Sequence, residues 1–230
     1  DLIKEEQMVV AFTHFGYIKR MPIDTYKSQR RGGKGITGIA TREEDFVKQI
    51  FTTSTHDTVL FFSNKGKLYR LRGYEIPEAG RTAKGTAIVN LLSLDAGEKI
   101  SAIIPISNFE DGKYLLMATR NGLIKKTALQ EYNSTRKTGL LAITLKDDDE
   151  LIDVRLTDGE DNVVLVTSKG MCITFDEKDV RPVGRSAQGV LGIRLDEDDF
   201  VIGMESILAD NKKATLLAIT ENGFGKRTEL

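Results

Sequence analysis

A repeat of about 50 residues organises this sequence and constrains the fold more than any other feature. Five segments share an apolar run, a tight turn that contains glycine, and a second run. Their turn glycines are Gly16, Gly66, Gly122, Gly170 and Gly223, separated by 50, 56, 48 and 53 residues. A second landmark is a loop that ends in a glycine, at Gly35, Gly85, Gly139 and Gly189. Two landmarks with one period indicate an array of similar structural units.

Each repeat has the pattern of four short strands. In the second repeat they are "TVLFF", "KLYRL", "GTAIVNLL" and "KISAIIPI", in which β-branched and aromatic residues dominate. The turns "NKG", "RNG", "SKG" and "ENG" are typical of hairpins, because glycine and asparagine accept positive φ. The sequence therefore predicts an all-β, propeller-like disc of four-stranded blades in one domain, residues 1–230. The predicted repeats are residues 8–57, 58–113, 114–161, 162–214 and, in part, 215–230.

The two ends of the sequence favour a fragment. The chain opens on Asp1 rather than Met, and it stops after the fifth hairpin, before that repeat's glycine loop. Because one repeat cannot bury its apolar face alone, we expect a truncated array.

Composition excludes several classes of protein. No apolar run approaches the roughly 20 residues of a membrane helix, so no membrane partner is expected. The single cysteine, Cys172, cannot form an internal disulfide, and its apolar neighbours predict a buried side chain. The two histidines, His14 and His56, have no ligand-like neighbours, which argues against a zinc site or a catalytic triad. The acidic runs "DDDE" and "DEDD" lack calcium-loop spacing and indicate a solvated edge.

Charge follows the repeat, although the net charge of the chain is only −1. From hairpin turn to loop glycine the net charges are +5 (residues 17–35), +4 (64–85), +4 (119–139) and +1 (168–189). The intervening segments are negative, from −2 to −6. Since equivalent positions of stacked repeats lie on one side, the cations predict a continuous basic track that suits a polyanion with regularly spaced phosphates.

The stretch "QRRGGKG", residues 29–35, is the loop of the first repeat and lies at the positive phase. Glycines allow the backbone to approach a phosphate and to present N–H groups to it. Arg30 and Arg31 have guanidinium forks for phosphate oxygens, and Lys34 is a point charge. A nucleotide-binding P-loop is excluded because the Walker spacing is missing.

The same seven residues resemble the box that marks the C-terminal domain of bacterial DNA gyrase A subunits, and "THFGYIKR" and "RNGLIKKTAL" are similar to that family too. The resemblance covers essentially the whole chain. It implies a β-pinwheel, normally of six blades that exchange strands, with double-stranded DNA wrapped right-handedly around a basic rim. It also implies a cytoplasmic bacterial enzyme, the ATP-dependent type IIA topoisomerase that introduces negative supercoils.

The resemblance places the chemistry elsewhere in the enzyme. The partners it implies are the remainder of the gyrase A subunit, together with the gyrase B subunit, in an A2B2 assembly where ATP and magnesium are used. This chain is expected to hold no catalytic residue, metal site or cofactor. The alternatives are the C-terminal domain of a topoisomerase IV A subunit, in which the box is usually degraded, and a propeller used as a protein-interaction scaffold. The predicted DNA-binding residues are Gln29, Arg30, Arg31, Gly32, Gly33, Lys34, Gly35, Lys19, Arg20, Lys65, Lys67, Arg70, Arg72, Arg81, Lys84, Arg120, Lys125, Lys126, Arg136, Lys137 and Arg185.

Overall fold

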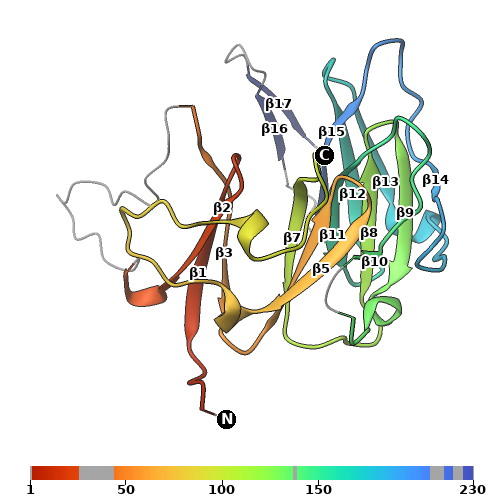
Figure 1. Ribbon diagram of the computed structural model, residues 1–230. Helices are drawn as coiled ribbons and strands as arrows, with labels where there is room; N and C mark the ends of the chain where they lie inside the picture. Colours follow the sequence, from red (N-terminus) through yellow and green to blue (C-terminus); the bar gives the residue numbers. More distant parts are fainter. Residues whose placement is uncertain (1, 26–43, 137–138, 208–214, 220–224, 230) are drawn as a thin grey trace. The chain divides into compact units, whose positions relative to one another are not determined.

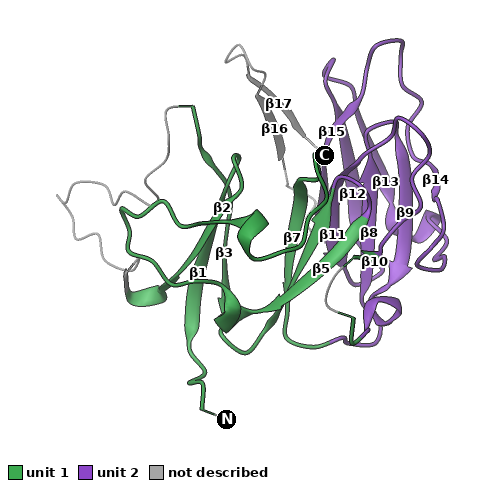
Figure 2. Ribbon diagram, in the orientation of Figure 1, with its two compact units in different colours: residues 1–63, 67–108, 135–140 green, residues 64–66, 109–134, 141–230 purple. Residues whose placement is uncertain are grey.

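The computed structural model describes residues 2–25, 44–136, 139–207, 215–219 and 225–229 (Figure 1). Strands and short 3-10 helices make up the regular structure of these residues, so the all-β prediction is confirmed. The described residues fall into two compact units (Figure 2), each treated by itself below. Unit 1 is residues 1–63, 67–108 and 135–140, and unit 2 is residues 64–66, 109–134 and 141–230. Among the described residues, no helix has the length and apolar character needed to span a membrane.

Unit 1 is built on two antiparallel sheets. The first has the order β3-β1-β2-β6 and the second the order β10-β5-β4-β7, in which β10 begins at Leu140, the last residue of the unit. The strands of the first sheet are β3 (Val47–Ser54), β1 (Gln7–Thr13), β2 (Tyr17–Pro22) and β6 (Thr86–Ala87). Those of the second are β10 (Leu140–Leu141), β5 (Lys67–Arg72), β4 (Thr58–Ser63) and β7 (Ile100–Ile106). Three 3-10 turns connect them: η1 (Ile23–Thr25), η2 (Gly73–Glu75) and η3 (Ile88–Asn90).

Unit 2 repeats the plan. One sheet has the order β11-β8-β9-β14, a second has the order β13-β12-β15, and β16 pairs with β17. The strands are β11 (Leu151–Thr157), β8 (Tyr114–Thr119), β9 (Leu123–Ala128), β14 (Val190–Leu191), β13 (Cys172–Asp176), β12 (Asn162–Thr167), β15 (Val201–Ile207), β16 (Thr215–Ile219) and β17 (Gly225–Glu229). The 3-10 turns are η4 (Leu129–Tyr132) and η5 (Glu177–Asp179).

The prediction from the repeat pattern that each repeat forms its own four-stranded blade is wrong for one strand, and the strand exchange that the family resemblance implies is confirmed. The run "GTAIVNLL" forms only the two-residue strand β6 and the turn η3, and β6 pairs with β2 of the preceding repeat: Tyr17 with Ala87 and Ile18 with Thr86. In the same way β14 of the fourth repeat pairs with β9 of the third, Val190 with Ile124 and Leu191 with Leu123. Each of these sheets therefore takes its outer strand from the next repeat.

Inner strands with consecutive buried residues, such as β1 and β4 in unit 1 and β8 in unit 2, form the cores of the two units. In unit 1, Val10 and Phe12 of β1 pack with Ile18 of β2 and Phe61 of β4 in one buried cluster. In unit 2, Leu116, Ile124, Leu165 and Val201 form the corresponding cluster. Each such side chain contributes roughly 1.5–3 kcal/mol by its removal from water.

Cys172 is exposed, which corrects the expectation that it is buried. It lies in β13, the strand at one edge of the order β13-β12-β15 among the described residues. The neighbouring Met171 is also 37% exposed. The apolar neighbours of Cys172 in the sequence do not cover its side chain, because an edge strand has a sheet partner on one side only.

Candidate nucleic-acid interface

Two described loops share the sequence pattern G-R-x-A-x-G. They are residues 80–85, "GRTAKG", in unit 1 and residues 184–189, "GRSAQG", in unit 2, and we call them the two basic loops. Each ends in a glycine with positive φ, +91° at Gly85 and +93° at Gly189. A Cβ on Gly85 would lie 2.6 Å from the carbonyl oxygen of Ile18, and a Cβ on Gly189 would lie 2.5 Å from that of Ile124. Glycine is therefore needed at both positions, for the dihedral angle and for the close approach to the strand below.

Backbone hydrogen bonds join the residues just before each basic loop to the second strand of the preceding repeat. In unit 1, the Arg20 amide donates to the Pro77 carbonyl (3.1 Å) and the Ala79 amide donates to the Arg20 carbonyl (3.2 Å). In unit 2, the Val183 amide donates to the carbonyl of Lys126 (2.8 Å). The main-chain hydrogen bonding between repeats thus continues into the residues before each basic loop. These backbone hydrogen bonds fix the position of the loop relative to the sheet.

The basic loops carry cations toward solvent. Arg81 is exposed, and Lys84 is half-buried with its ammonium 4.0 Å from the centre of the Tyr17 ring. Arg185 is half-buried, and its Nη1 donates to the carbonyl of Leu141 (2.8 Å). A cation over an aromatic face is held in place without losing its charge. The sequence analysis does not predict this role of Tyr17 in holding Lys84. The sequence feature that could have indicated it is the position of Tyr17 directly after the turn glycine Gly16.

Three predicted DNA-contact residues are corrected by the structure. Lys19 and Lys125 are 0% and 1% exposed, and Lys126 is 4% exposed, so none of their side chains is available to a duplex. Lys126 Nζ lies 3.4 Å from a carboxylate oxygen of the fully buried Glu177. Burial lowers the pKa of Lys19, and it lowers that of Lys125 to about 8, with the Arg185 charge adding to the effect.

The remaining predicted cations lie on or beside the strands, and Arg20, Lys67 and Arg120 already contact other groups of the protein. Arg20 donates from Nε to the carbonyl of Ile76 (2.6 Å). The ammonium of Lys67 lies 2.8 Å from Asp95, and this hydrogen bond raises the pKa of Lys67. The guanidinium carbon of Arg120 lies 3.7 Å from the centre of the Phe200 ring. Arg70 is half-buried, whereas Lys65 and Arg136 are exposed. The exposed or half-buried positions of these six residues keep them in the candidate set.

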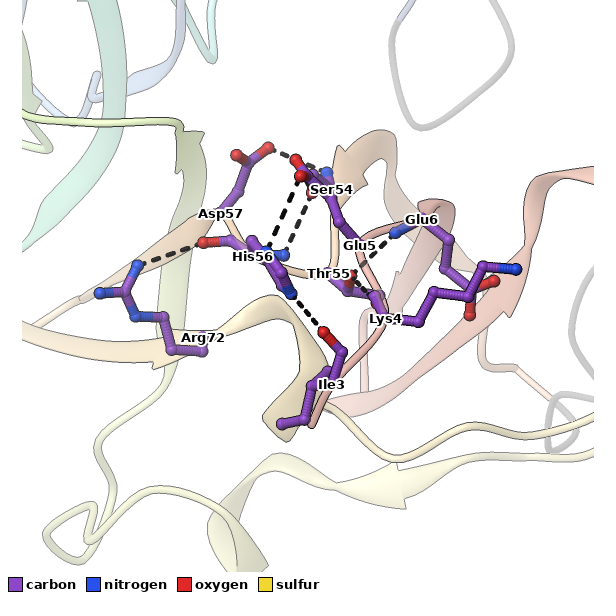
Figure 3. Close-up of polar contacts among 9 residues, drawn as sticks. All are labelled: Ile3, Lys4, Glu5, Glu6, Ser54, Thr55, His56, Asp57 and Arg72. Atoms are coloured by element: carbon purple, nitrogen blue, oxygen red, sulfur yellow. Dashed lines mark hydrogen bonds and ion pairs between the residues drawn. The ribbon is translucent and has the colours of Figure 1, made fainter. Parts of the chain in front are cut away.

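Arg72 belongs to a separate polar network at the start of the chain (Figure 3). Its Nη1 donates to the carbonyl of His56 (3.1 Å), whose ring Nε2 lies 2.8 Å from the carbonyl oxygen of Ile3. The hydroxyl of Thr55 donates to the carbonyl of Lys4 (2.9 Å) and accepts from the amide of Glu6 (3.1 Å). The exposed Arg72 side chain therefore helps to fix the turn that holds the N-terminal segment of the chain.

The box at residues 29–35 and Lys137 lie outside the described residues. Their predicted roles, and the predicted continuous track through all repeats, remain predictions. The alignment of the repeats relates the box to the basic loops, because "RRGGKG" and "GRTAKG" end at equivalent loop glycines, Gly35 and Gly85.

An acidic cluster is the candidate for metal chemistry within the described part of the chain. Single carboxylate oxygens of Asp158, Asp161 and Glu177 all lie within 4.8 Å of one another. Glu177 already accepts from the Thr157 hydroxyl (2.8 Å) and the Asp161 amide (3.0 Å), besides its contact with Lys126. Burial and the neighbouring Asp158 raise the pKa of Asp161 to about 6. The hydrogen bonds of Glu177 and its buried ion pair with Lys126 account for this cluster.

Comparison with known proteins agrees with the repeat and the sheets. The family described as "DNA gyrase C-terminal domain, beta-propeller" matches residues 7–54, 57–107, 113–158, 161–207 and 214–230. The DNA gyrase A subunit of Clostridium acetobutylicum is 57% identical over 192 residues, 84% of this chain and 23% of the relative. That of Staphylococcus epidermidis is 48% identical over 230 residues, 99% of this chain and 26% of the relative. The chain thus spans about a quarter of the length of these curated relatives.

Two solved structures have the same fold. The C-terminal domain of a DNA topoisomerase IV superposes with a TM-score of 0.81 at 34% identity, over 100% of this chain and 69% of that one. A DNA gyrase A C-terminal domain gives a TM-score of 0.75 at 31% identity, over 98% of this chain and 72% of that one. These matches and the all-β sheets lead to one conclusion: the chain belongs to the DNA gyrase C-terminal domain family, whose fold is a β-propeller.

Proposed function

We propose that this chain binds double-stranded DNA without reading its sequence and curls it into a right-handed wrap, which lets a DNA gyrase introduce negative supercoils. The observation that carries the proposal is the pair of basic loops at residues 80–85 and 184–189. Each presents an arginine from a segment fixed to the neighbouring strand by its main chain. Phosphate contacts of this kind position a duplex without identifying its bases.

The energetics set the number of contacts that such a wrap needs. Bending a 20–30 bp site by 40–90° costs on the order of 1–6 kcal/mol. Each phosphate that is neutralised adds roughly 0.9 to the negative slope of log K against log salt. Several cations in each unit, Arg81 and Lys84 in unit 1 and Arg185 and Arg120 in unit 2 among them, are available to offset the bending energy.

The proposal includes the rest of the enzyme. The partners are the remainder of the gyrase A subunit, together with the gyrase B subunit, in an A2B2 assembly of the bacterial cytoplasm; they supply the cleaving tyrosine, the ATPase and the magnesium. On this proposal the chain itself contributes DNA geometry only: a right-handed wrap presents a neighbouring duplex to the cleaved segment as a positive crossing, and strand passage inverts that crossing.

The test uses the holoenzyme and a nicked plasmid. Sealing the nick while the enzyme is bound without ATP should give topoisomers shifted toward positive linking difference. Replacing residues 29–35 with alanines should abolish this shift and the ATP-dependent supercoiling, while relaxation activity remains. Normal supercoiling by that variant would refute the role given to the box.

The second candidate is a topoisomerase IV A subunit, favoured by the superposition on a topoisomerase IV domain. It predicts DNA binding without the positive shift, since the same fold would then bend DNA without winding it. The plasmid experiment separates the two.

A further inference from the structure

Lys19 has an uncommon environment for a lysine. Its side chain is 0% exposed, yet its ammonium group donates to three main-chain carbonyls of the basic loop in unit 1: Gly80 (2.7 Å), Arg81 (2.8 Å) and Ala83 (3.0 Å). An ammonium is the side-chain donor suited to this task, because its three N–H groups point in three directions from one atom. The loop therefore closes around the lysine.

Lys125 repeats the arrangement in unit 2. It is 1% exposed, and its ammonium donates to the carbonyl of Ala142 (2.6 Å) and to that of Arg185, in the second basic loop. Arg185 stands at the same place in "GRSAQG" as Arg81 in "GRTAKG". The strand register is also the same, since Lys19 pairs with Ala11 and Lys125 with Met117. A buried lysine that donates to a basic loop thus occurs in both units, with three loop carbonyls in unit 1 and one in unit 2.

The sequence ties this lysine to the type of loop that follows. The third residue after the turn glycine is Lys19 in repeat 1 and Lys125 in repeat 3, and in both cases the next repeat has a G-R-x-A-x-G loop. In repeat 2 the position holds Tyr69, whose hydroxyl donates to Glu98 (2.8 Å), and the next repeat has "STRKTG" instead. The lysine and the basic loop therefore occur together.

We propose that Lys19 and Lys125 are positioning residues for DNA binding: the buried ammonium of Lys19 holds three carbonyls of one basic loop inward, and that of Lys125 holds the Arg185 carbonyl of the other, so that the arginine side chains meet the phosphates. The inference rests on the proposed function and assigns these residues a role beneath the interface, not in it. In a turn, successive N–H groups that point away from inward-held carbonyls form a concavity that anions favour.

The cost of losing the ammonium follows from the same contacts. Methionine at either position matches the length of the lysine stem but has no donor. The carbonyls of Arg81 and Ala83 in unit 1, and that of Arg185 in unit 2, would lose the ammonium, whereas Gly80 would still accept from the Ala83 amide and Ala142 from the Tyr132 hydroxyl. The loop would relax to let these carbonyls reach water. Arg81 and Lys84 would keep their charges and lose the fixed loop backbone that carries them.

The test measures loop order and DNA binding separately, in the intact protein. In Lys19→Met, hydrogen exchange of the Ala83 amide, which donates to Gly80 (3.1 Å), should rise by about tenfold or more, while amides of β1 keep their protection. The slope of log K against log salt should fall by about 1.8, the loss of two phosphate contacts. Adding Arg81→Ala and Lys84→Ala to Lys19→Met should change the slope no further, whereas the same pair in the wild-type background should lower it.

Lys126→Met is the matched control. It also removes a buried lysine, next to Lys125, but Lys126 contacts Glu177 and not the carbonyls of a basic loop. It should lower the stability of the fold and leave the salt slope and the exchange of the Ala187 amide unchanged. If Lys19→Met proves too unstable to study, Lys125→Met tests the same device in unit 2. Lys19→Gln, which retains two donors, should restore part of the protection.

The outcomes are distinct. Unchanged exchange in both Lys19→Met and Lys125→Met overturns the inference. Faster exchange in Lys19→Met with an unaltered salt slope also overturns it, provided that Arg81→Ala/Lys84→Ala lowers that slope in the wild-type background. A wild-type protein that binds DNA without salt dependence would refute the proposed function instead, and the exchange measurement would still decide whether the lysines hold the loops.

Discussion

Replacing the last glycine of a basic loop with alanine is expected to destabilise the protein for two separable reasons. Gly85 has a φ of +91°, a backbone conformation that costs an L-residue about 1–2 kcal/mol. A Cβ there would also lie 2.6 Å from the carbonyl oxygen of Ile18 and 3.3 Å from the Cβ of Lys19. Because the nearest atom belongs to the backbone of a buried strand, the loop itself must move, at an overpacking cost of about 1–3 kcal/mol. We expect Gly85→Ala to lower the free energy of unfolding by about 2–5 kcal/mol.

A control in the same unit isolates the second reason. Gly97 has a φ of +75°, and a Cβ there would meet no atom within 4 Å. Gly97→Ala should therefore show the conformational cost alone, about 1–2 kcal/mol. In unit 2, Gly189 and Gly170 form the corresponding pair, with φ of +93° and +83° and with open space only at Gly170.

Urea unfolding of the four variants measures the effect. The excess loss in Gly85→Ala over Gly97→Ala, and in Gly189→Ala over Gly170→Ala, is the energy of the loop-to-strand contact. Equal losses within either pair would refute the reasoning, because they would mean that the loop moves away from the strand at no cost. A second measurement, the salt slope of DNA binding, should fall in Gly85→Ala and not in Gly97→Ala.

Three further predictions concern buried polar groups. Lys126→Met leaves the carboxylate of Glu177 buried without its ion-pair partner and should lower the free energy of unfolding by about 3–5 kcal/mol. The double variant Lys126→Met/Glu177→Gln should lose clearly less than the sum of the two single losses. Additive losses in urea unfolding would contradict the pairing. Asp161 has its pKa raised to about 6 in the folded protein, chiefly by burial, so the folded state holds a proton that the unfolded state releases, and stability falls as the pH rises from about 4 to 6. Asp161→Asn should therefore raise the melting temperature at pH 7 and leave it nearly unchanged at pH 4, and a gain that is the same at both pH values would disprove this assignment. Thr55→Val removes both hydrogen bonds of a side chain that is 2% exposed and should cost about 1–3 kcal/mol, with faster exchange of the Glu6 amide; unchanged exchange would show that the segment is held by other contacts.

The repeat and its hairpins could be predicted from the sequence because they depend on local signals. The turn glycines Gly16, Gly66, Gly122 and Gly170 all have positive φ, as the hairpin patterns predict. The partner of the third run could not be predicted in this way. A two-residue strand such as β6 has no periodicity of its own, and its pairing with β2 is decided by contacts between repeats.

The interior lysines were misassigned for a related reason. A lysine in a strand is usually solvated. Summing the charges between the hairpin turn and the loop glycine of each repeat therefore treats Lys19 and Arg81 alike. Their difference lies in tertiary contacts, namely whether carbonyls from a distant loop converge on the ammonium group. One signal was present: the equivalent positions of the other repeats hold Tyr69, which is buried, and Ile173, so this register belongs to the interior.

The borrowed outer strand has an evolutionary corollary. The boundaries of a sequence repeat do not coincide with the boundaries of a sheet, since β2 pairs with β6 and β9 pairs with β14, each from the next repeat. Recombination that adds or removes one whole period leaves every inner sheet with a donor, because whichever copy comes next supplies an equivalent pair of residues. A family with this architecture can change its number of blades by a single crossover without inventing a new interface.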